Sequence, residues 1–336
     1  MSMKRNDFID FIKGVAILLV LVGHAIQYCC GEEYFSQGAY FSNPIFKFIY
    51  TFHMPLFMVV SGYLLQQTLD HRTEMEVAKR RLRQLGLPIL SFGVLAFTIK
   101  WAVHPVFDIL ECAKDLFSTI VGNLWFLWAL LYNQLLLLFI RRMGDKVWMY
   151  VLAGVLIYFI PDSSYIPARY TFLYLFLVVG YMTGKYTLYR IYTGKRHIGI
   201  SASMLVLYIS VLYATRTLFA SVWGWSELGG VLHTIMRQVI AFFALGWILP
   251  LLYGVYQVCS AKRIVRFVMN AGQNSLGIYY FQTLIFILIS RVCHLLPSLE
   301  VWGVLIGGVV ITIECLLFVW WSRRYGVTRL LVLGSR

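Results

Sequence analysis

Three ionisable side chains, Asp10, Lys13 and His24, interrupt the first long apolar segment of the chain, residues 8–28. Ionisable groups within a segment of membrane-spanning length cost free energy and usually serve a function. A neutral imidazole held in such a segment can act as a general base or as a nucleophile. These three residues are therefore the first catalytic candidates.

The spacing places the three side chains on one stripe of a helix. Lys13 and His24 are eleven residues apart, so they lie about 20° apart around the helix axis, and Asp10 lies about 40° from the line of His24. Helical rise puts His24 about 16 Å from Lys13, toward the other end of the segment. Two alternatives stay open: Asp10 and Lys13 can be interfacial residues that snorkel, and His24 can be a helix-packing residue.

The second apolar segment, residues 45–67, contains a histidine beside a proline. Pro55 frees a backbone carbonyl one turn earlier and can kink the helix. By helical rise His53 lies about 12 Å into the segment, within reach of His24 if the two helices pack together. Ser61, which precedes a glycine, allows close approach of a neighbouring helix. The alternative interpretation is a packing kink with a hydrogen-bonded histidine.

An acidic residue in the last apolar segment matches the depth of Lys13. By helical rise, Glu314 lies about 20 Å from the outer end of its segment and Lys13 about 22 Å from the outer end of its own. We expect a neutralising pair, because an unpaired buried charge is costly. The alternative is that Glu314 is protonated or hydrogen-bonded within the bundle.

Further binding candidates lie at the ends of the apolar segments. Arg80 and Arg83, with Lys79, form a cluster that can face one phosphate-bearing ligand, although cytoplasmic loops are ordinarily basic. Trp125 follows Asn123 near the outer end of the fourth segment, where a tryptophan can stack on a sugar ring or anchor the helix at the interface. Near the outer start of the eighth segment, Arg237 is a candidate contact for substrate or lipid headgroups, with snorkelling as the equal alternative.

The elements that must position these residues are membrane-spanning helices. The chain has 336 residues, of which 60% are hydrophobic and 13% are charged, whereas a soluble domain is nearer half apolar and a quarter charged. A bilayer core requires about 20 mostly apolar residues in a helix. The candidate segments are 8–28, 45–67, 86–104, 120–140, 147–160, 169–185, 198–216, 233–257, 271–292 and 301–322. The sequence thus predicts an all-α polytopic membrane protein, a bundle of about ten transmembrane helices that forms a single domain over residues 1–336.

The basic residues orient this bundle. With the N-terminus in the cytoplasm, 21 of the 29 Lys and Arg residues fall in the inner segments and seven in the outer half. The bias follows the positive-inside rule, so both termini are expected in the cytoplasm. The net charge of +14 then reflects orientation, and nucleic acid is not expected as a partner. The six cysteines form no Cys-x-x-Cys pair, so no metal site is expected.

The motifs together resemble the membrane acyltransferase-3 family, specifically its fucose 4-O-acetylase-like members. The matching motifs are Ile9-Asp10-Phe11-Ile12-Lys13-Gly14 through Val22-Gly23-His24, Phe52-His53-Met54-Pro55-Leu56-Phe57 with Ser61-Gly62-Tyr63, Arg80-x-x-Arg83, and Asn123-Leu124-Trp125-Phe126-Leu127. The chain departs from the family pattern at two places. Lys13 stands where arginine is commoner, and Gln282 stands near a place that is often histidine.

The resemblance implies an acyl-CoA-dependent O-acyltransferase without a metal. Such an enzyme moves an acyl group, usually acetyl, from cytoplasmic acetyl-CoA to a hydroxyl of a cell-surface glycan or lipid-linked saccharide, here in a bacterial inner membrane. His24 would act as catalytic base or acyl acceptor. The predicted catalytic set is His24, Lys13, Asp10 and Glu314; the predicted CoA-binding set is Arg80, Arg83 and Lys79; and the predicted acceptor-site set is His53, Ser61, Asn123, Trp125 and Arg237.

A transporter or flippase for a lipid-linked sugar is the alternative function. It would also need about ten helices, intramembrane polar residues and a basic inner rim. Transporters carry paired helices broken by glycine or proline in both halves, whereas Met54-Pro55 is the one clear kink motif in this sequence. A structural or sensor subunit would account for the composition but not for His24. The enzyme interpretation predicts release of CoA that depends on His24.

Overall fold

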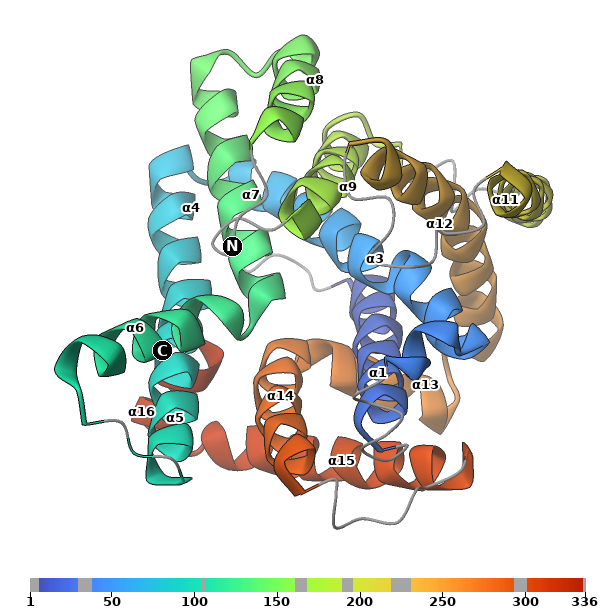
Figure 1. Ribbon diagram of the computed structural model, residues 1–336. Coiled ribbons are helices and arrows are strands. Elements are labelled where there is room, and N and C mark those ends of the chain that lie inside the picture. The colour runs from blue at the N-terminus through green and yellow to red at the C-terminus, as the bar shows by residue number, and fades with distance from the viewer. Residues whose placement is uncertain are drawn as a thin grey trace.

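The computed structural model describes residues 6–29, 38–103, 105, 107–160, 168–188, 196–218, 231–292 and 301–334. These residues form helices and their connections, and no strand occurs among them. Figure 1 shows α1 and α3 near the centre of the bundle, with α11 at its periphery beside α12. The all-α fold class predicted from the sequence is confirmed.

Most of the described chain lies in long helices. These are α1 (Asp7–Cys29), α3 (Pro44–Leu69), α5 (Leu87–Val103), α7 (Trp125–Met143), α9 (Ala168–Lys185), α11 (His197–Leu218), α12 (Val231–Cys259), α14 (Ser275–Val292) and α15 (Val301–Ser322). Shorter helices connect or flank them: α4 (Glu74–Arg81), α6 (Ile109–Gly122), α8 (Val147–Leu156), α13 (Arg263–Gln273) and α16 (Gly326–Leu333). Single turns are η1 (Ala39–Ser42), the π-helical η2 (Leu82–Gly86) and η3 (Ile157–Phe159).

Each of the ten predicted segments contains a helix, although several cross element boundaries: 120–140 includes the end of α6 and most of α7, 147–160 covers α8 and η3, and 271–292 covers the end of α13 and all of α14. Within the described ranges, six helices are long and apolar enough to cross a membrane. They are Asp7–Cys29, Pro44–Leu69, Glu74–Ala102, Trp125–Met143, His197–Ala214 and Thr234–Cys259. The chain is therefore an integral multi-pass membrane protein. The count of about ten spans and the cytoplasmic termini are not confirmed and stay predictions.

Local sequence fixes where α3 and α4 begin. The side chain of Asn43 accepts hydrogen bonds from the first free N–H groups of α3, and Pro44 occupies the first helical position. Thr73 and Glu76 cap α4 reciprocally, each side chain bonding the backbone N–H of the other residue. The π turn η2 then joins α4 to α5 in one continuous helix.

Two helix pairs approach so closely that only glycine fits at the crossing. A Cβ added to Gly14 or Gly272, where α1 meets α13, would lie 1.9 or 1.8 Å from a facing carbonyl oxygen. A Cβ added to Gly62 or Gly180, where α3 meets α9, would lie 2.0 or 1.9 Å from one. Such contacts permit tight helix packing in membranes. They fix the two helices, α1 and α3, that carry the first catalytic candidates.

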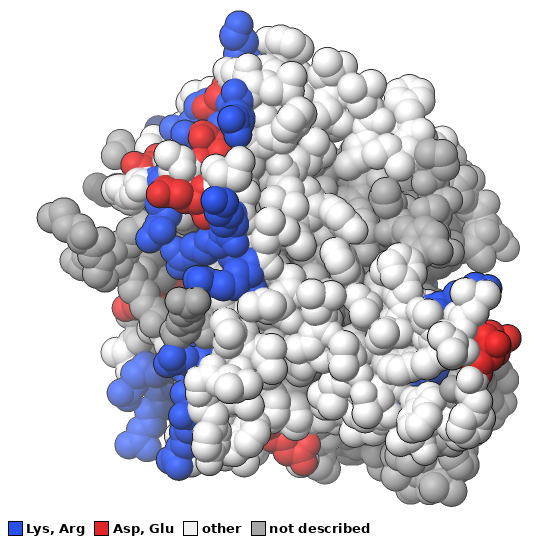
Figure 2. All heavy atoms as spheres, turned by 90° about the vertical axis from the view of Figure 1, so that its left-hand side faces the viewer, with Lys and Arg blue, Asp and Glu red and all other residues white. Residues whose placement is uncertain are grey.

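The charged residues are segregated from a broad uncharged surface. Figure 2 shows Lys and Arg gathered in a band along one side of the molecule, beside a face that has few charges. The C-terminal ends of α4 and α7 are basic, with Lys79, Arg80 and Arg81 on α4 and Arg141 and Arg142 on α7. A basic band beside an apolar surface is typical of a membrane protein whose charges lie at one interface.

Candidate functional site

The stripe of ionisable residues on α1 forms as expected, but its charge pair differs from the prediction. Asp10 is buried, and its carboxylate lies 3.6 Å from the Lys13 ammonium one turn away. Glu314 is exposed on α15. The expected Lys13–Glu314 pair is therefore wrong, because depth alone cannot tell which face of a helix carries a side chain, and Asp10 already neutralises Lys13.

Lys13 borders two cavities that meet at α1 and α14. The first, which we call the basic cavity, has a volume of about 480 Å³. Its lining is Lys13, Gln273, Asn274, Ser275, Leu276, Gly277, Arg323, Arg329 and Leu333. The break between α13 and α14 at Asn274 opens this space, because the chain turns there beside the end of α15.

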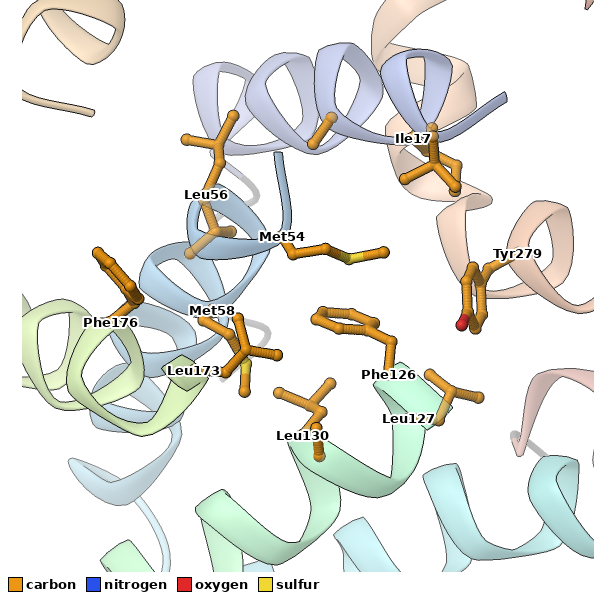
Figure 3. Packing of buried hydrophobic residues seen from close by; sticks show 14 of the residues in the cluster. Ile17, Met54, Leu56, Met58, Phe126, Leu127, Leu130, Leu173, Phe176 and Tyr279 are labelled. Carbon is orange, nitrogen blue, oxygen red and sulfur yellow. The ribbon is translucent and has the colours of Figure 1, made fainter. Parts of the chain in front are cut away.

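The second space, the central cavity, has a volume of about 210 Å³ and is mainly apolar. It shares Lys13, Ser275 and Leu276 with the basic cavity. Its polar side chains include Ser61, Arg81 and Gln134, and its apolar lining includes Ile17, Met54, Phe126, Leu127, Leu130 and Tyr279. Figure 3 shows Met54 and Tyr279 pointing toward one another from α3 and α14, with Phe126 of α7 below them.

The third space, the histidine cavity, has a volume of about 370 Å³ and contains His24. Met54 and Tyr279 line both this cavity and the central one, so they stand at the boundary between the two. The sequence-predicted residues Asn123 and Trp125 line it as well. Three adjoining cavities thus lead from the cations of the basic cavity, past Lys13, to His24.

His24 is held in one orientation by its neighbours. Its Nδ1 lies 3.3 Å from Oε1 of Gln282 on α14, and Gln282 is completely buried. Because an amide oxygen only accepts, Nδ1 is the donor in this pairing, and in a neutral ring the lone pair then lies on Nε2. The rings of Phe286 and Tyr28 stand edge-on to the imidazole at 5.5 and 6.1 Å. The site therefore holds the imidazole in one orientation, with Nδ1 turned toward Gln282.

His53 takes the structural form that the sequence left as an alternative. It is 1% exposed, its Nδ1 donates to the carbonyl of Ile49 at 2.7 Å, and Tyr50 packs edge-on against its ring. This bond satisfies one nitrogen, while Nε2 is buried with no partner among the described residues. His53 is not in the lining of the histidine cavity.

The basic cluster on α4 contributes a different residue from those predicted. Lys79 and Arg83 are exposed and Arg80 is half-buried, and none of the three lines a described cavity. Arg81 lines the central cavity and donates from Nη1 to Gln84 at 3.4 Å. The π turn directly after Arg81 widens the helix and changes which side chains share a face, so simple helical spacing fails here.

Arg237 is also separate from the three cavities. Its guanidinium lies over the ring of Phe172 at 5.0 Å, on the α9 side of α12. Arg237 lines none of the cavities described above, so it is not among the residues that surround the cavity of His24. In the described part of the chain, no three His, Cys, Asp or Glu side chains come together as a metal site would require.

Three residues that sequence reasoning did not select line or complete the site. Gln282 orients His24, Gln134 is 1% exposed in the central cavity, and Arg329 lines the basic cavity. The criterion that selected His24, a polar residue within an apolar segment, also applies to Gln134 and Gln282. If amide side chains had been considered as well as ionisable ones, the same criterion would have selected Gln134 and Gln282.

Fold and site together define an integral membrane protein whose helices enclose three neighbouring cavities, one lined by cations and another by a histidine. The family model described as "Acyltransferase domain" (Acyl_transf_3) matches residues 6–320. The chain belongs to this acyltransferase family, as the motifs around Lys13 and His24 predicted, and it is an acyltransferase. The match begins just before α1 and ends within α15, so it includes every helix that lines the three cavities except α16.

Two curated relatives are each named "Nodulation protein NolL". The protein from Mesorhizobium japonicum is 26% identical over 357 residues, which cover 99% of this chain and 91% of that protein. The protein from Sinorhizobium fredii is 28% identical over 313 residues, which cover 89% of this chain and 82% of that protein. No solved structure matches the chain.

Proposed function

We propose that this protein transfers an acetyl group from acetyl-CoA to a hydroxyl of a cell-surface glycan or lipid-linked saccharide. The observation that carries the proposal is the row of three adjoining cavities, with cations at one end and His24 at the other. A phosphate-bearing donor and a hydroxyl acceptor need these two environments, and the two reactants must meet at one base.

The dimensions of the path suit a small acyl group. The central cavity is about 210 Å³, and Met54 and Tyr279 line both it and the histidine cavity. Its largely apolar lining suits a thioester arm, and the polar groups of Ser61 and Gln134 are available to the amides of that arm. The nucleotide stays behind in the basic cavity, while only the acyl end passes Met54 and Tyr279 into the histidine cavity.

His24 performs the transfer through Nε2. In one route Nε2 takes the proton of the acceptor hydroxyl, whose oxygen attacks the thioester carbonyl; the carbon–sulfur bond breaks and the CoA sulfur leaves as the thiol after taking the proton. In the other, Nε2 attacks the thioester carbonyl, the carbon–sulfur bond breaks and CoA leaves as its thiolate. The acceptor oxygen then attacks the acyl group, the bond to Nε2 breaks, and the hydroxyl proton passes to the thiolate. Both routes need the Nδ1 proton to be held by Gln282. The product is an O-acyl ester.

The acceptor occupies the histidine cavity. Trp125 and Tyr50 offer aromatic faces to a sugar ring, and Asn123 offers a polar side chain. The predicted acceptor residues Ser61, His53 and Arg237 have other positions, in the central cavity, against the carbonyl of Ile49 and over Phe172. We therefore assign acceptor recognition to Asn123 and Trp125.

The proposal includes the orientation of the chain. About ten helices cross a bacterial inner membrane as one domain, both termini lie in the cytoplasm, and membrane lipids surround the uncharged surface seen in Figure 2. Lys79, Arg80 and Arg83 then lie at the cytoplasmic rim, where their positive potential attracts the CoA phosphates.

The test uses purified full-length protein reconstituted in liposomes that contain a candidate glycan inside. Labelled acetyl-CoA is added outside, and the trapped glycan is analysed by mass spectrometry. Acetylation that is released by mild base identifies an O-acyl ester formed across the bilayer. A transporter would instead release unmodified glycan from the liposomes without consuming acetyl-CoA, and that result would overturn the proposal.

A further inference from the structure

The basic cavity is lined by more cationic side chains than have acidic partners among the described residues. Lys13, Arg323 and Arg329 line it, and no Asp or Glu does. Asp10 neutralises Lys13 from outside the lining, at 3.6 Å. Neither Arg323 nor Arg329 has an acidic partner within the described residues. Clustered cations without acids repel one another, so the cavity favours an anion.

Buried polar atoms in the same cavity lack partners. Nε of Arg329 and Oδ1 of Asn274 are both inaccessible and make no hydrogen bond within the described part of the chain. Asn274 is 7% exposed, and its amide nitrogen donates to Asn270. An unpaired buried guanidinium nitrogen is costly, and a phosphate oxygen is the acceptor it suits best.

Arg329 is held in place by the packing of α16. The hydroxyl of Ser91 on α5 donates to the carbonyl of Leu331 at 2.7 Å. Gly334, with φ of 58°, ends α16 against the backbone of Gln84 in the π turn. The helix that carries Arg329 is thus fixed to the same segment that supplies Arg81 to the central cavity.

We infer that the basic cavity binds the phosphates of the CoA donor, with Arg329 and Arg323 as the ligating side chains. The inference rests on the proposed function and deepens it. Lys13 stands between the basic and central cavities, about 16 Å from His24 by helical rise. The phosphates and the thioester are separated in CoA by the extended pantetheine arm, which the central cavity receives. The phosphate site is therefore in the turn after α15 and on α16, and Lys79, Arg80 and Arg83 do not form it.

An anionic lipid headgroup has the same phosphate chemistry, so the experiment must separate the two sources. The protein is reconstituted in nanodiscs of phosphatidylcholine alone, and kcat/KM is measured with acetyl-CoA and with acetyl-pantetheine, which has no phosphates. Arg329→Gln should lower kcat/KM for acetyl-CoA about 10- to 100-fold, because hydrogen bonds to charged groups are strong. The same change should leave acetyl-pantetheine nearly unaffected, and Arg323→Gln should act in the same direction.

Arg324→Gln is the matched control. Arg324 adjoins Arg323 but lies over the ring of Trp320 at 3.7 Å and does not line the cavity, so its loss should leave both donors unchanged. Arg329→Lys should restore part of the acetyl-CoA preference because it keeps the charge but not the planar fork. If Arg329→Gln does not fold, Arg323→Gln, whose side chain is exposed, provides the same comparison.

Each outcome has a distinct meaning. An unchanged ratio of acetyl-CoA to acetyl-pantetheine in Arg329→Gln and Arg323→Gln overturns the phosphate site but leaves the proposed function intact. A wild-type protein that uses neither donor refutes the proposed function instead. If phosphatidylglycerol in the nanodisc raises the unfolding temperature through Arg329 while CoA does not compete, a lipid headgroup occupies the cavity and the CoA assignment is wrong.

Discussion

The hydrogen bond between Gln282 and His24 allows a quantitative test of how the histidine is positioned. The change is Gln282→Met, which keeps the length and flexibility of the side chain but provides no amide oxygen. We expect kcat to fall about three- to tenfold while KM for acetyl-CoA stays the same. The reason is that Gln282 contacts the imidazole and does not line the cavities that receive the donor.

The magnitude follows from the geometry. The Nδ1–Oε1 distance of 3.3 Å is longer than the usual N–H···O bond, and a neutral hydrogen bond of ordinary strength contributes about 0.5–1.5 kcal/mol. Since about 1.4 kcal/mol corresponds to a tenfold change in rate, a loss of that bond changes kcat by about three- to tenfold. The free energy of unfolding should not fall, because Nε2 of Gln282 is buried without a partner among the described residues and methionine removes that cost.

The assay is stopped-flow measurement of CoA thiol release from detergent-purified protein, with thermal unfolding measured alongside. Gln282→Glu retains an acceptor oxygen at the same reach and should keep more activity than Gln282→Met. The positioning role is refuted if Gln282→Met has wild-type kcat. It is also refuted if both variants lose activity only in proportion to their loss of thermal stability.

Three further predictions concern packing, acyl length and pH. Gly14→Ala should destabilise the protein, because the added Cβ would lie 1.9 Å from a carbonyl oxygen of α13, whereas Gly199→Ala, with no atom within 4 Å, should not; thermal unfolding of both variants compares them. Met54→Ala should raise turnover of butyryl-CoA relative to acetyl-CoA, because it removes side-chain volume at the boundary between the central and histidine cavities, and equal effects on both donors would contradict this. Burial raises the pKa of Asp145, but hydrogen bonds from Lys185 and two tyrosines prevail and hold that pKa below its ordinary 3.8. Asp145 therefore contributes stability above about pH 4 that is lost as pH falls through its folded-state pKa, so Asp145→Asn should narrow the stability difference between neutral and acid pH in urea titrations.

The elements of the fold were predictable because helix length in a bilayer is a strong constraint. Apolar runs of about 20 residues are read directly from sequence, and each of the ten predicted runs contains helix in the structure. Breaks inside helices are less visible. The turn at Asn274, between α13 and α14, and the π turn after Arg81 occur within continuous patterns, because neighbouring helices determine where the backbone departs from regularity.

The site was predictable where one helix carries it. Asp10, Lys13 and His24 share a stripe of α1, so helical spacing alone placed them correctly relative to one another. Contacts between helices depend on how each helix is rotated about its own axis, and residue spacing within one helix does not determine that rotation. For this reason the Lys13–Glu314 pair was wrong, and Gln282, which reaches His24 across 258 residues of sequence, was not assigned to it.

The arginines that line the cavities come from segments far apart in the sequence. Sequence reasoning chose Arg80 and Arg83 because they lie in the densest basic cluster. The cavities instead contain Arg81, Arg323 and Arg329, whose positions depend on the π turn and on the docking of α16. The density of basic residues in the sequence therefore indicated the basic side of the molecule, but it did not indicate which guanidinium groups line the cavities.

The central claim is that His24 transfers an acyl group from a CoA donor. The most direct measurement is the release of free CoA from acetyl-CoA by the purified full-length protein in the presence of a glycan acceptor. His24→Ala is compared with His71→Ala, whose side chain is exposed beyond the end of α3. We predict that CoA release falls at least about a hundredfold in His24→Ala, since a general base contributes about 10²–10⁴, and stays at the wild-type rate in His71→Ala. Equal rates of CoA release in wild type and His24→Ala would contradict the account.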